Sequence, residues 1–178
     1  DPLCLAMPAG LRAKNICLVS MQRSFGELCR SHAQCSHFAL LERTDGEEWV
    51  VLYDRGTRMP VIQVARIPAS CGGLARHNVS NALHAIAAAY LVGIEVAAMR
   101  ASLSRFQMNF ESNPGRLNIH DSGPVRFLVD CAHNPDGIAK LSEFVDRLQP
   151  AGRKLVAFSA AGYNPEAIIT GNAHAAAG

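Results

Sequence analysis

The chain has 178 residues, of which 49% are hydrophobic, 18% are charged and 6% are aromatic. This profile is typical of a soluble globular protein with one domain or two small ones. Its 17 basic and 15 acidic residues are scattered along the sequence, which excludes the basic surface of a nucleic-acid binder. No uncharged apolar run reaches the roughly 18 residues of a membrane span, and the first residues do not resemble a signal peptide. We therefore expect a cytoplasmic protein without nucleic-acid or membrane partners.

The six cysteines form no Cys-x-x-Cys pair. Most of them lie inside apolar segments, where a reduced cysteine acts as a small hydrophobic residue. We therefore expect neither a metal site nor a disulfide framework. The cysteines are Cys4, Cys17, Cys29, Cys35, Cys71 and Cys131.

The first third of the chain has the pattern of an α/β protein. A short helix is expected within residues 1–14, interrupted by Pro8 and Gly10. A short apolar run at residues 15–20 is typical of a buried parallel strand, and residues 24–33 can form one or two helical turns. Three β-rich segments with turns between them then predict a small antiparallel meander. These segments are residues 37–42, 49–54 and 59–67.

The middle of the chain is predicted to be helical. After a loop at residues 68–74, an Ala-rich helix spans residues 77–92 and ends at Gly93. A second helix at residues 95–105 follows a very short connection, so we expect the two helices to form a tight pair. Periodicity stops at residues 107–115, which we interpret as a domain boundary.

The sequence of the last third of the chain predicts a strand–helix–strand unit. Two strands, at residues 116–120 and 125–129, flank a hairpin turn at Ser122-Gly123-Pro124. A helix from about residue 135 to 148 has one apolar stripe, and a buried strand is predicted at residues 154–159. A right-handed βαβ crossover would place the loop after residue 129 at the carboxyl edge of the sheet, where open α/β sheets bind ligands.

Polar residues crowd the opening turn of the helix at residues 77–92. Asn78 and Asn81 are three residues apart, so both lie on one helix face, and two carboxamides there could contact the edge of a heterocycle. Free backbone N–H groups at a helix start also favour anions. The alternative is ordinary helix capping by asparagine and serine.

A second polar cluster follows the strand at residues 125–129. Asp130, at the strand's end, could accept the two hydroxyls of a ribose. Pro135 can begin the next helix, and Asn134 is placed to cap it, so capping is again the alternative. Arg116, between a loop and a strand, could contact a phosphate, although an isolated arginine is more often a solvated surface residue. His133 is predicted to be an ordinary hydrogen-bonded histidine, because no metal partner lies at suitable spacing.

Four stretches of the sequence occur in the order of a known family's motifs. They are residues 1–3 (DPL), 72–83 (GGLARHNVSNAL), 113–118 (NPGRLN) and 127–137 (FLVDCAHNPDG). Together they resemble the Mur ligase superfamily of ATP-dependent amide ligases. This superfamily includes peptidoglycan precursor ligases, folylpolyglutamate synthases and the carboxy-terminal half of cyanophycin synthetase, and the likeness is strongest to the last. The resemblance covers roughly residues 1–160.

The resemblance implies a set of nucleotide contacts but no catalytic residue and no metal ligand within the chain. It also implies the reaction: ATP phosphorylates a substrate carboxylate, and an amine attacks the acyl phosphate to give an amide. The expected partners are therefore ATP with Mg²⁺, an amino-acid or peptide carboxylate and an amine acceptor, and a homo-oligomer remains open. By motif position, Asn78 and Asn81 would face adenine, Arg116 the phosphates and Asp130 the ribose, with His133 and Asn134 shaping the site between domains.

The sequence also departs from the family pattern. The family's phosphate loop and Mg²⁺ ligands lie before the point where this sequence begins, so we expect a truncated chain. Residues 1–112 would be the end of the central ATPase domain, and residues 113–178 the start of a Rossmann-like carboxy-terminal domain. Cys131 stands where the family commonly has tyrosine, and residues 163–178 do not match the family's substrate-binding segment.

Three functional hypotheses follow. The first is part of an ATP-dependent amide ligase. The second is a non-catalytic fragment or remnant with at most a weak adenine-nucleotide half-site, and we expect the 178 residues alone to form no amide. The third is a nucleotide-binding α/β protein unrelated to ligases.

Overall fold

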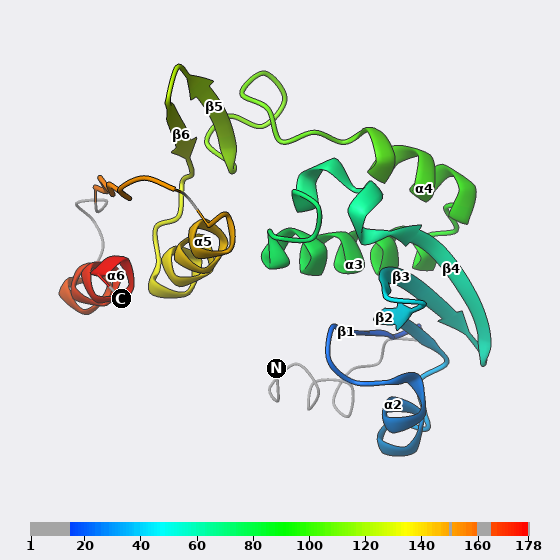
Figure 1. Cartoon of the computed structure of the whole chain (residues 1–178). Coiled ribbons are helices and arrows are strands. Elements are labelled where there is room, and N and C mark those ends of the chain that lie inside the picture. Colours follow the sequence, from blue (N-terminus) through cyan, green and yellow to red (C-terminus); the bar gives the residue numbers. More distant parts are fainter. Residues whose placement is uncertain (1–14, 150, 160–164, 178) are drawn as a thin grey trace. The chain divides into compact units, whose positions relative to one another are not determined.

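The computed structural model describes residues 15–149, 151–159 and 165–177 (Figure 1). The helix expected within residues 1–14 therefore lies outside the described residues. The chain divides into two compact units: unit 1 comprises Asp1–Gly73 and Asn78–Phe106, and unit 2 comprises Leu74–His77 and Gln107–Gly178. The main division follows Phe106. The assignment of residues 1–112 and 113–178 to two ligase domains stays a prediction.

Unit 1 is built on a four-stranded sheet in the order β1-β2-β3-β4. The strand β1 pairs with β2 in parallel, while β2, β3 and β4 form consecutive antiparallel hairpins. Both the parallel strand and the meander are thus confirmed. The strands are β1 (Cys17–Ser20), β2 (His37–Thr44), β3 (Glu47–Asp54) and β4 (Thr57–Gln63).

Two tight turns set the register of this sheet. Asp45 and Gly46 join β2 to β3, and Arg55 and Gly56 join β3 to β4, all four with positive φ (54°, 83°, 47° and 86°). Turns with two such residues match the right-handed twist of paired strands. The Asp-Gly and Arg-Gly pairs therefore fold as predicted from the sequence.

Helix α2 (Phe25–Ser31) packs on the sheet and confirms the predicted helical turns. Ser24 caps it, and the Glu27 carboxylate accepts the backbone N–H of Ser24 at 2.7 Å. Leu28 is buried in a core with residues of β1, β2 and β3, among them Phe38. Burial of this apolar face holds the helix against the sheet.

The strand predicted to reach residue 67 is too long, because β4 ends at Gln63. Two short 3₁₀ helices follow, η2 (Val64–Arg66) and η3 (Pro68–Ser70). The buried hydroxyl of Ser70 donates to the carbonyls of Val64 and Ile67, both at 2.8 Å. These bonds satisfy backbone groups that a strand would have paired with a neighbour.

The two predicted helices in the middle of the chain are present as α3 (Arg76–Leu91) and α4 (Val96–Arg105). Gly93, with φ of 86°, separates them. The predicted tight pairing of these helices is wrong, because the closest backbone neighbours of α4 are β4 and η3. Arg100 holds α4 there by donating to the carbonyls of Val61 and Pro60 at 2.6 and 3.1 Å.

Unit 2 contains a β-hairpin and two helices. The hairpin pairs β5 (Asn118–Ser122) with β6 (Val125–Val129) in antiparallel register and confirms the predicted turn. Helix α5 (Pro135–Arg147) confirms the predicted helix. A further helix, α6 (Glu166–Ala177), packs against α5 and is missing from the sequence prediction.

The predicted buried strand at residues 154–159 is wrong. The described residues 151–159 contain no helix or strand, and Leu155, Val156 and Phe158 are 87%, 69% and 49% exposed. Among the described residues β6 pairs only with β5, so the predicted parallel βαβ unit of a Rossmann-like domain is not formed there. An apolar run becomes a strand only where a neighbouring strand can pair its backbone groups. The mixed α/β class itself is confirmed.

Candidate functional site

The two asparagines of α3 form a joined pair in unit 1. Asn78 is only 7% exposed, and its Nδ2 donates to the carbonyl of Ala69 at 2.8 Å. Asn81 is exposed, and its Nδ2 donates to Oδ1 of Asn78 at 3.3 Å. One bond goes to the carbonyl of Ala69 and the other joins the two side chains, so neither bond caps a first-turn N–H group of α3. The expected common helix face is confirmed.

Arg116 and Asp130 are brought together in unit 2. The N–H of Leu117 donates to Oδ2 of Asp130 at 2.9 Å, and the N–H of Cys131 donates to the carbonyl of Gly115 at 2.7 Å. These two bonds fasten the turn at Gly115–Leu117 to the end of β6. Arg116 lies at the centre of this turn, and its side chain is exposed.

The turn has an unusual backbone that the carboxylate stabilises. Gly115 and Leu117 both have positive φ, 70° and 48°, although Leu117 is a buried residue with a side chain that disfavours this region. A Cβ on Gly115 would collide with the Sγ of Cys131, so only glycine fits this close approach. Asp130 therefore holds a strained turn in place by accepting the N–H of Leu117.

Asn118 organises the same turn, and sequence reasoning gave it no role. It is 6% exposed. Its Oδ1 accepts the N–H of Gly115 at 2.6 Å, and its Nδ2 lies 3.0 Å from the carbonyl of Asn113 and 3.3 Å from that of Arg116. The available signal was an asparagine at the first position of a strand, where a buried amide needs several partners.

The loop after β6 leads directly into α5. Asn134 caps this helix, because its Oδ1 accepts the N–H of Gly137 at 2.8 Å, which confirms the capping alternative for this residue. The Nδ1 of the exposed His133 lies 3.0 Å from the carbonyl of Cys131. The carbonyl of His133 accepts Nδ2 of Asn172, from α6, at 3.1 Å.

His77 lies in the same compact unit as Asp130. Its ring is edge-on to that of Phe144, with the centroids 6.5 Å apart. Partial burial lowers the pKa of His77, and the negative charge of Asp130 partly offsets this effect. Because its ordinary pKa is about 6.5, His77 is a neutral imidazole at neutral pH.

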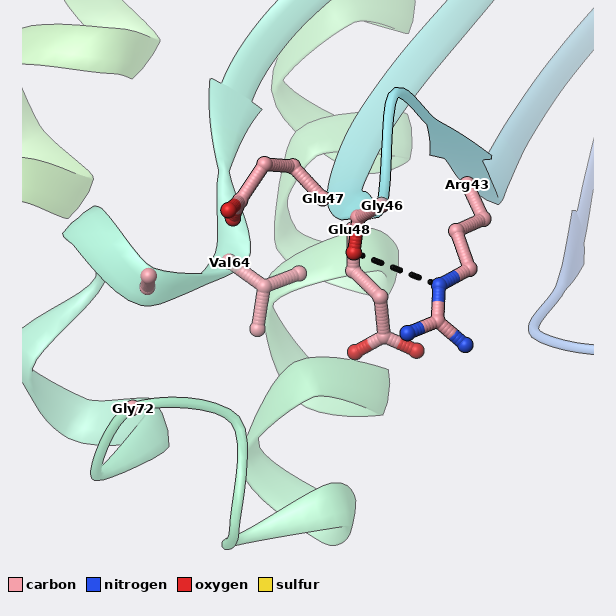
Figure 2. A pocket seen from close by; sticks show the side chains of 7 residues that line it. Arg43, Gly46, Glu47, Glu48, Val64 and Gly72 are labelled. Atoms are coloured by element: carbon pink, nitrogen blue, oxygen red, sulfur yellow. Dashed lines mark hydrogen bonds between the residues drawn. The ribbon is translucent and has the colours of Figure 1, made fainter.

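A shallow hollow of about 360 Å³ lies in unit 1, near the turn between β2 and β3 (Figure 2). Arg43 at its edge donates from Nε to the carbonyl of Gly46 at 3.3 Å. None of the six predicted nucleotide-contacting residues lines it, and two of its lining residues are glutamates, whose charge opposes that of a phosphate. Its lining residues are Arg43, Gly46, Glu47, Glu48, Val64, Ala65 and Gly72.

In the part of the chain that the structure describes, no group of three or more histidine, cysteine, aspartate or glutamate side chains is arranged to hold a metal ion. No helix of these residues is long and apolar enough to cross a membrane. The five described cysteines are free thiols, and burial raises the pKa of Cys17 to about 12.

The chain is similar in sequence to ligases of the Mur type. Within this class, the chain is 30% identical over 145 residues to cyanophycin synthetase of Synechocystis sp. and 33% identical over 131 residues to that of Nostoc sp.. A shorter match of 82 residues is 35% identical to the chloroplastic MurE homolog of Arabidopsis thaliana, a UDP-N-acetylmuramoyl-L-alanyl-D-glutamate--2,6-diaminopimelate ligase. No known family model matches the chain. The predicted resemblance is thereby confirmed.

The cyanophycin synthetase matches cover most of this chain and the MurE match covers less than half, but all three cover little of each relative. The three alignments span 82%, 74% and 46% of the chain, and 16%, 14% and 10% of the respective relatives. The similarity therefore concerns one segment of much longer enzymes.

Proposed function

We propose that this chain is part of an ATP-dependent acid–amino acid ligase of the Mur ligase type, resembling cyanophycin synthetase. The observation that carries the proposal is the Asp130 carboxylate fastened to the turn that bears Arg116. The carboxylate is suited to accept ribose hydroxyls, and the guanidinium of Arg116, on the turn bonded to it, is suited to bind phosphate oxygens. The matches to cyanophycin synthetases support it.

Each proposed role fits the chemistry of its residue. Asp130 uses Oδ2 for the N–H of Leu117, and a carboxylate has enough lone pairs to accept ribose hydroxyls as well. Arg116 is exposed and can form two parallel hydrogen bonds to a phosphate. The exposed Asn81 presents its carboxamide to adenine, and the buried Asn78 is hydrogen-bonded to it. His133 and Asn134 belong to the loop that shapes the nucleotide site.

The proposed reaction begins with transfer of the γ-phosphoryl group of ATP to a carboxylate of an amino acid or peptide. An amine then attacks the acyl carbon, and phosphate leaves as the amide forms. Mg²⁺ bound with ATP would neutralise part of the negative charge of the phosphates. In this scheme the described residues bind and orient the nucleotide, while the phosphate loop and Mg²⁺ ligands come from other parts of the ligase.

Replacement of Asp130 tests the proposal on the 178-residue chain. Asp130→Ala should weaken ATP binding by about one to two orders of magnitude, because a charge-assisted hydrogen bond contributes roughly 1.5–3 kcal/mol. The melting temperature should fall as well, because the N–H of Leu117 loses its partner. Both quantities are measured on the same sample, by calorimetric titration and by thermal unfolding.

Two further variants sharpen this experiment. Asp130→Asn keeps an oxygen for the N–H of Leu117 but removes the charge, so it should bind ATP weakly while unfolding near the wild-type temperature. Asp121→Ala removes an exposed carboxylate that pairs with Arg126 and should leave ATP binding unchanged. A lower melting temperature with unaltered ATP affinity in Asp130→Ala would overturn the ribose assignment. ATP binding without amide formation in a ligase that contains the segment would favour the non-catalytic alternative.

A further inference from the structure

The two asparagines of α3 differ in what they expose. Asn78 is buried, and both ends of its carboxamide are bonded within the protein: Nδ2 to the carbonyl of Ala69 at 2.8 Å, and Oδ1 to Nδ2 of Asn81 at 3.3 Å. Asn81 is exposed, and the bond to Asn78 is the one hydrogen bond that its side chain makes to the described residues. The pair therefore has an inner member and an outer member.

The carbonyl of Ala69 fixes the direction of this chain of hydrogen bonds. A carbonyl can only accept, so the Nδ2 group of Asn78 must face Ala69, and its Oδ1 must face the other way. Oδ1 in turn can only accept, so Asn81 must present a nitrogen to it. A rotation of the Asn81 carboxamide by 180° would place two oxygens together.

The fixed orientation leaves a defined set of groups on Asn81. One N–H is used by Asn78, while Oδ1 and the second N–H remain available on the exposed side chain. An adjacent acceptor and donor match the N6 amino group and N7 of adenine, which an asparagine can bind with two hydrogen bonds. Guanine presents two acceptors at the same edge, O6 and N7, so one contact would become repulsive.

We propose that Asn78 is a positioning residue that fixes the orientation of the Asn81 carboxamide and thereby makes the site selective for adenine over guanine. This inference rests on the proposed nucleotide-binding function and divides the two asparagines into different roles. Asn81 contacts the base. Asn78 acts through Asn81 and touches no nucleotide.

A double-mutant cycle in the 178-residue chain tests this division. The affinities for ATP and GTP are measured by titration for wild type, Asn78→Ala, Asn81→Ala and the double variant. Wild type should prefer ATP over GTP by about tenfold or more, as a well-formed pair of base contacts implies. Each single variant should lose about tenfold in ATP affinity and lose the preference, and the double variant should be no weaker than the singles. Ala85→Ser, at an exposed position of the same helix, should resemble wild type.

Nuclear magnetic resonance of the side-chain amides provides a readout in the wild-type chain, which keeps the test decisive if Asn78→Ala does not fold. ATP should shift the Nδ2 signals of Asn81 strongly and those of Asn78 weakly, and GTP at the same concentration should shift neither strongly. The exposed variant Asn81→Asp, which cannot donate to Asn78, should bind both nucleotides weakly and without preference.

Different experimental results would contradict this inference and the proposed function. No binding of either nucleotide by wild type would overturn both. ATP binding with additive losses in the double variant, or with equally large shifts of both asparagines, would overturn the positioning role and leave the proposed function standing. Equal affinities for ATP and GTP would overturn the selectivity.

Discussion

At the scale of single residues, buried amides hold the proposed site together. Asn118 accepts the N–H of Gly115 and donates to the carbonyls around Arg116, including that of Asn113. An unsatisfied buried polar group costs about 1–3 kcal/mol. The backbone geometry at the exposed Arg116 therefore depends on a buried side chain.

Removal of this amide should destabilise unit 2 without altering its surface. We predict that Asn118→Ala lowers the free energy of unfolding of unit 2 by about 1–3 kcal/mol, because Gly115 and its neighbours lose buried partners. Amide hydrogen exchange along β5 and β6 measures this loss. Asn109→Ala, which removes exposed hydrogen bonds to Ser112, serves as the control and should have a smaller effect. Equal exchange rates in the two variants would contradict the prediction.

His77 should make unit 2 sensitive to acid. Burial lowers its pKa in the folded chain, so below the unfolded value of about 6.5 the unfolded state binds a proton that the folded state does not. Stability should therefore fall as the pH decreases from 7.5 to 5.5. His77→Gln should reduce this pH dependence, whereas His120→Gln, at an exposed position of β5, should not. Denaturant unfolding at several pH values gives the comparison.

Residue types and spacing predicted which side chains lie on one helix face, but not what they bond. The pairing of Asn78 with Asn81 follows from a spacing of three residues. The partner of Asn78, Ala69, lies nine residues earlier, and Leu117, the partner of Asp130, lies 13 residues earlier. Such contacts depend on how the intervening chain folds, so the sequence could not show that Asn78 is buried or that Asp130 holds a turn.

At the scale of elements, predictions succeeded where the signal is local. The hairpin turns of unit 1, the capped helix α5 and the glycine after α3 each follow from a few adjacent residues. The strand at residues 154–159 failed because its formation depends on a neighbour. Helix α6 was missed although its Ala-rich sequence favours a helix.

Helix α6 packs against the start of α5 through a position that has no room for a side chain. A Cβ on Gly171 would lie 2.7 Å from Cγ of Pro135, and the adjacent Asn172 donates to the carbonyl of His133. The divergent end of the chain therefore contacts the loop of the proposed nucleotide site.

This close approach should reverse the usual stabilising effect of replacing a glycine by alanine in a helix. Replacement of glycine by alanine in an exposed helix stabilises it by about 1 kcal/mol, but Gly171→Ala should destabilise α6 because the new methyl group displaces Pro135. Hydrogen exchange of the α6 amides should become faster. Ala173→Gly, at an exposed position of the same helix, should show only the ordinary propensity effect. Slower exchange in Gly171→Ala would show that the helix does not pack on Pro135.

At the scale of the whole molecule, the sequence predicted two units and the approximate place of their division. We expected the boundary between residues 112 and 113, within the stretch without periodicity at residues 107–115, and the compact units of the structure divide after Phe106. The sequence could not predict that Leu74–His77 belong to unit 2, because the chain continues from them without a break into the unit 1 residues of α3. Only the packing of the folded chain assigns these residues to a unit.

Limited proteolysis should reveal this division. Phe110 is 66% exposed and Glu111 is also exposed, and the hydrogen bonds of Ser112 are local ones to Asn109 and Gln107. Little free energy is therefore needed to open this segment for a protease. We predict that the first cuts fall between residues 107 and 115, by chymotrypsin after Phe110 and by a glutamate-specific protease after Glu111. Phe110→Ala should remove the first cut and keep the second. An initial cut within residues 77–92, where backbone groups are bonded along α3, would contradict the two-unit organisation.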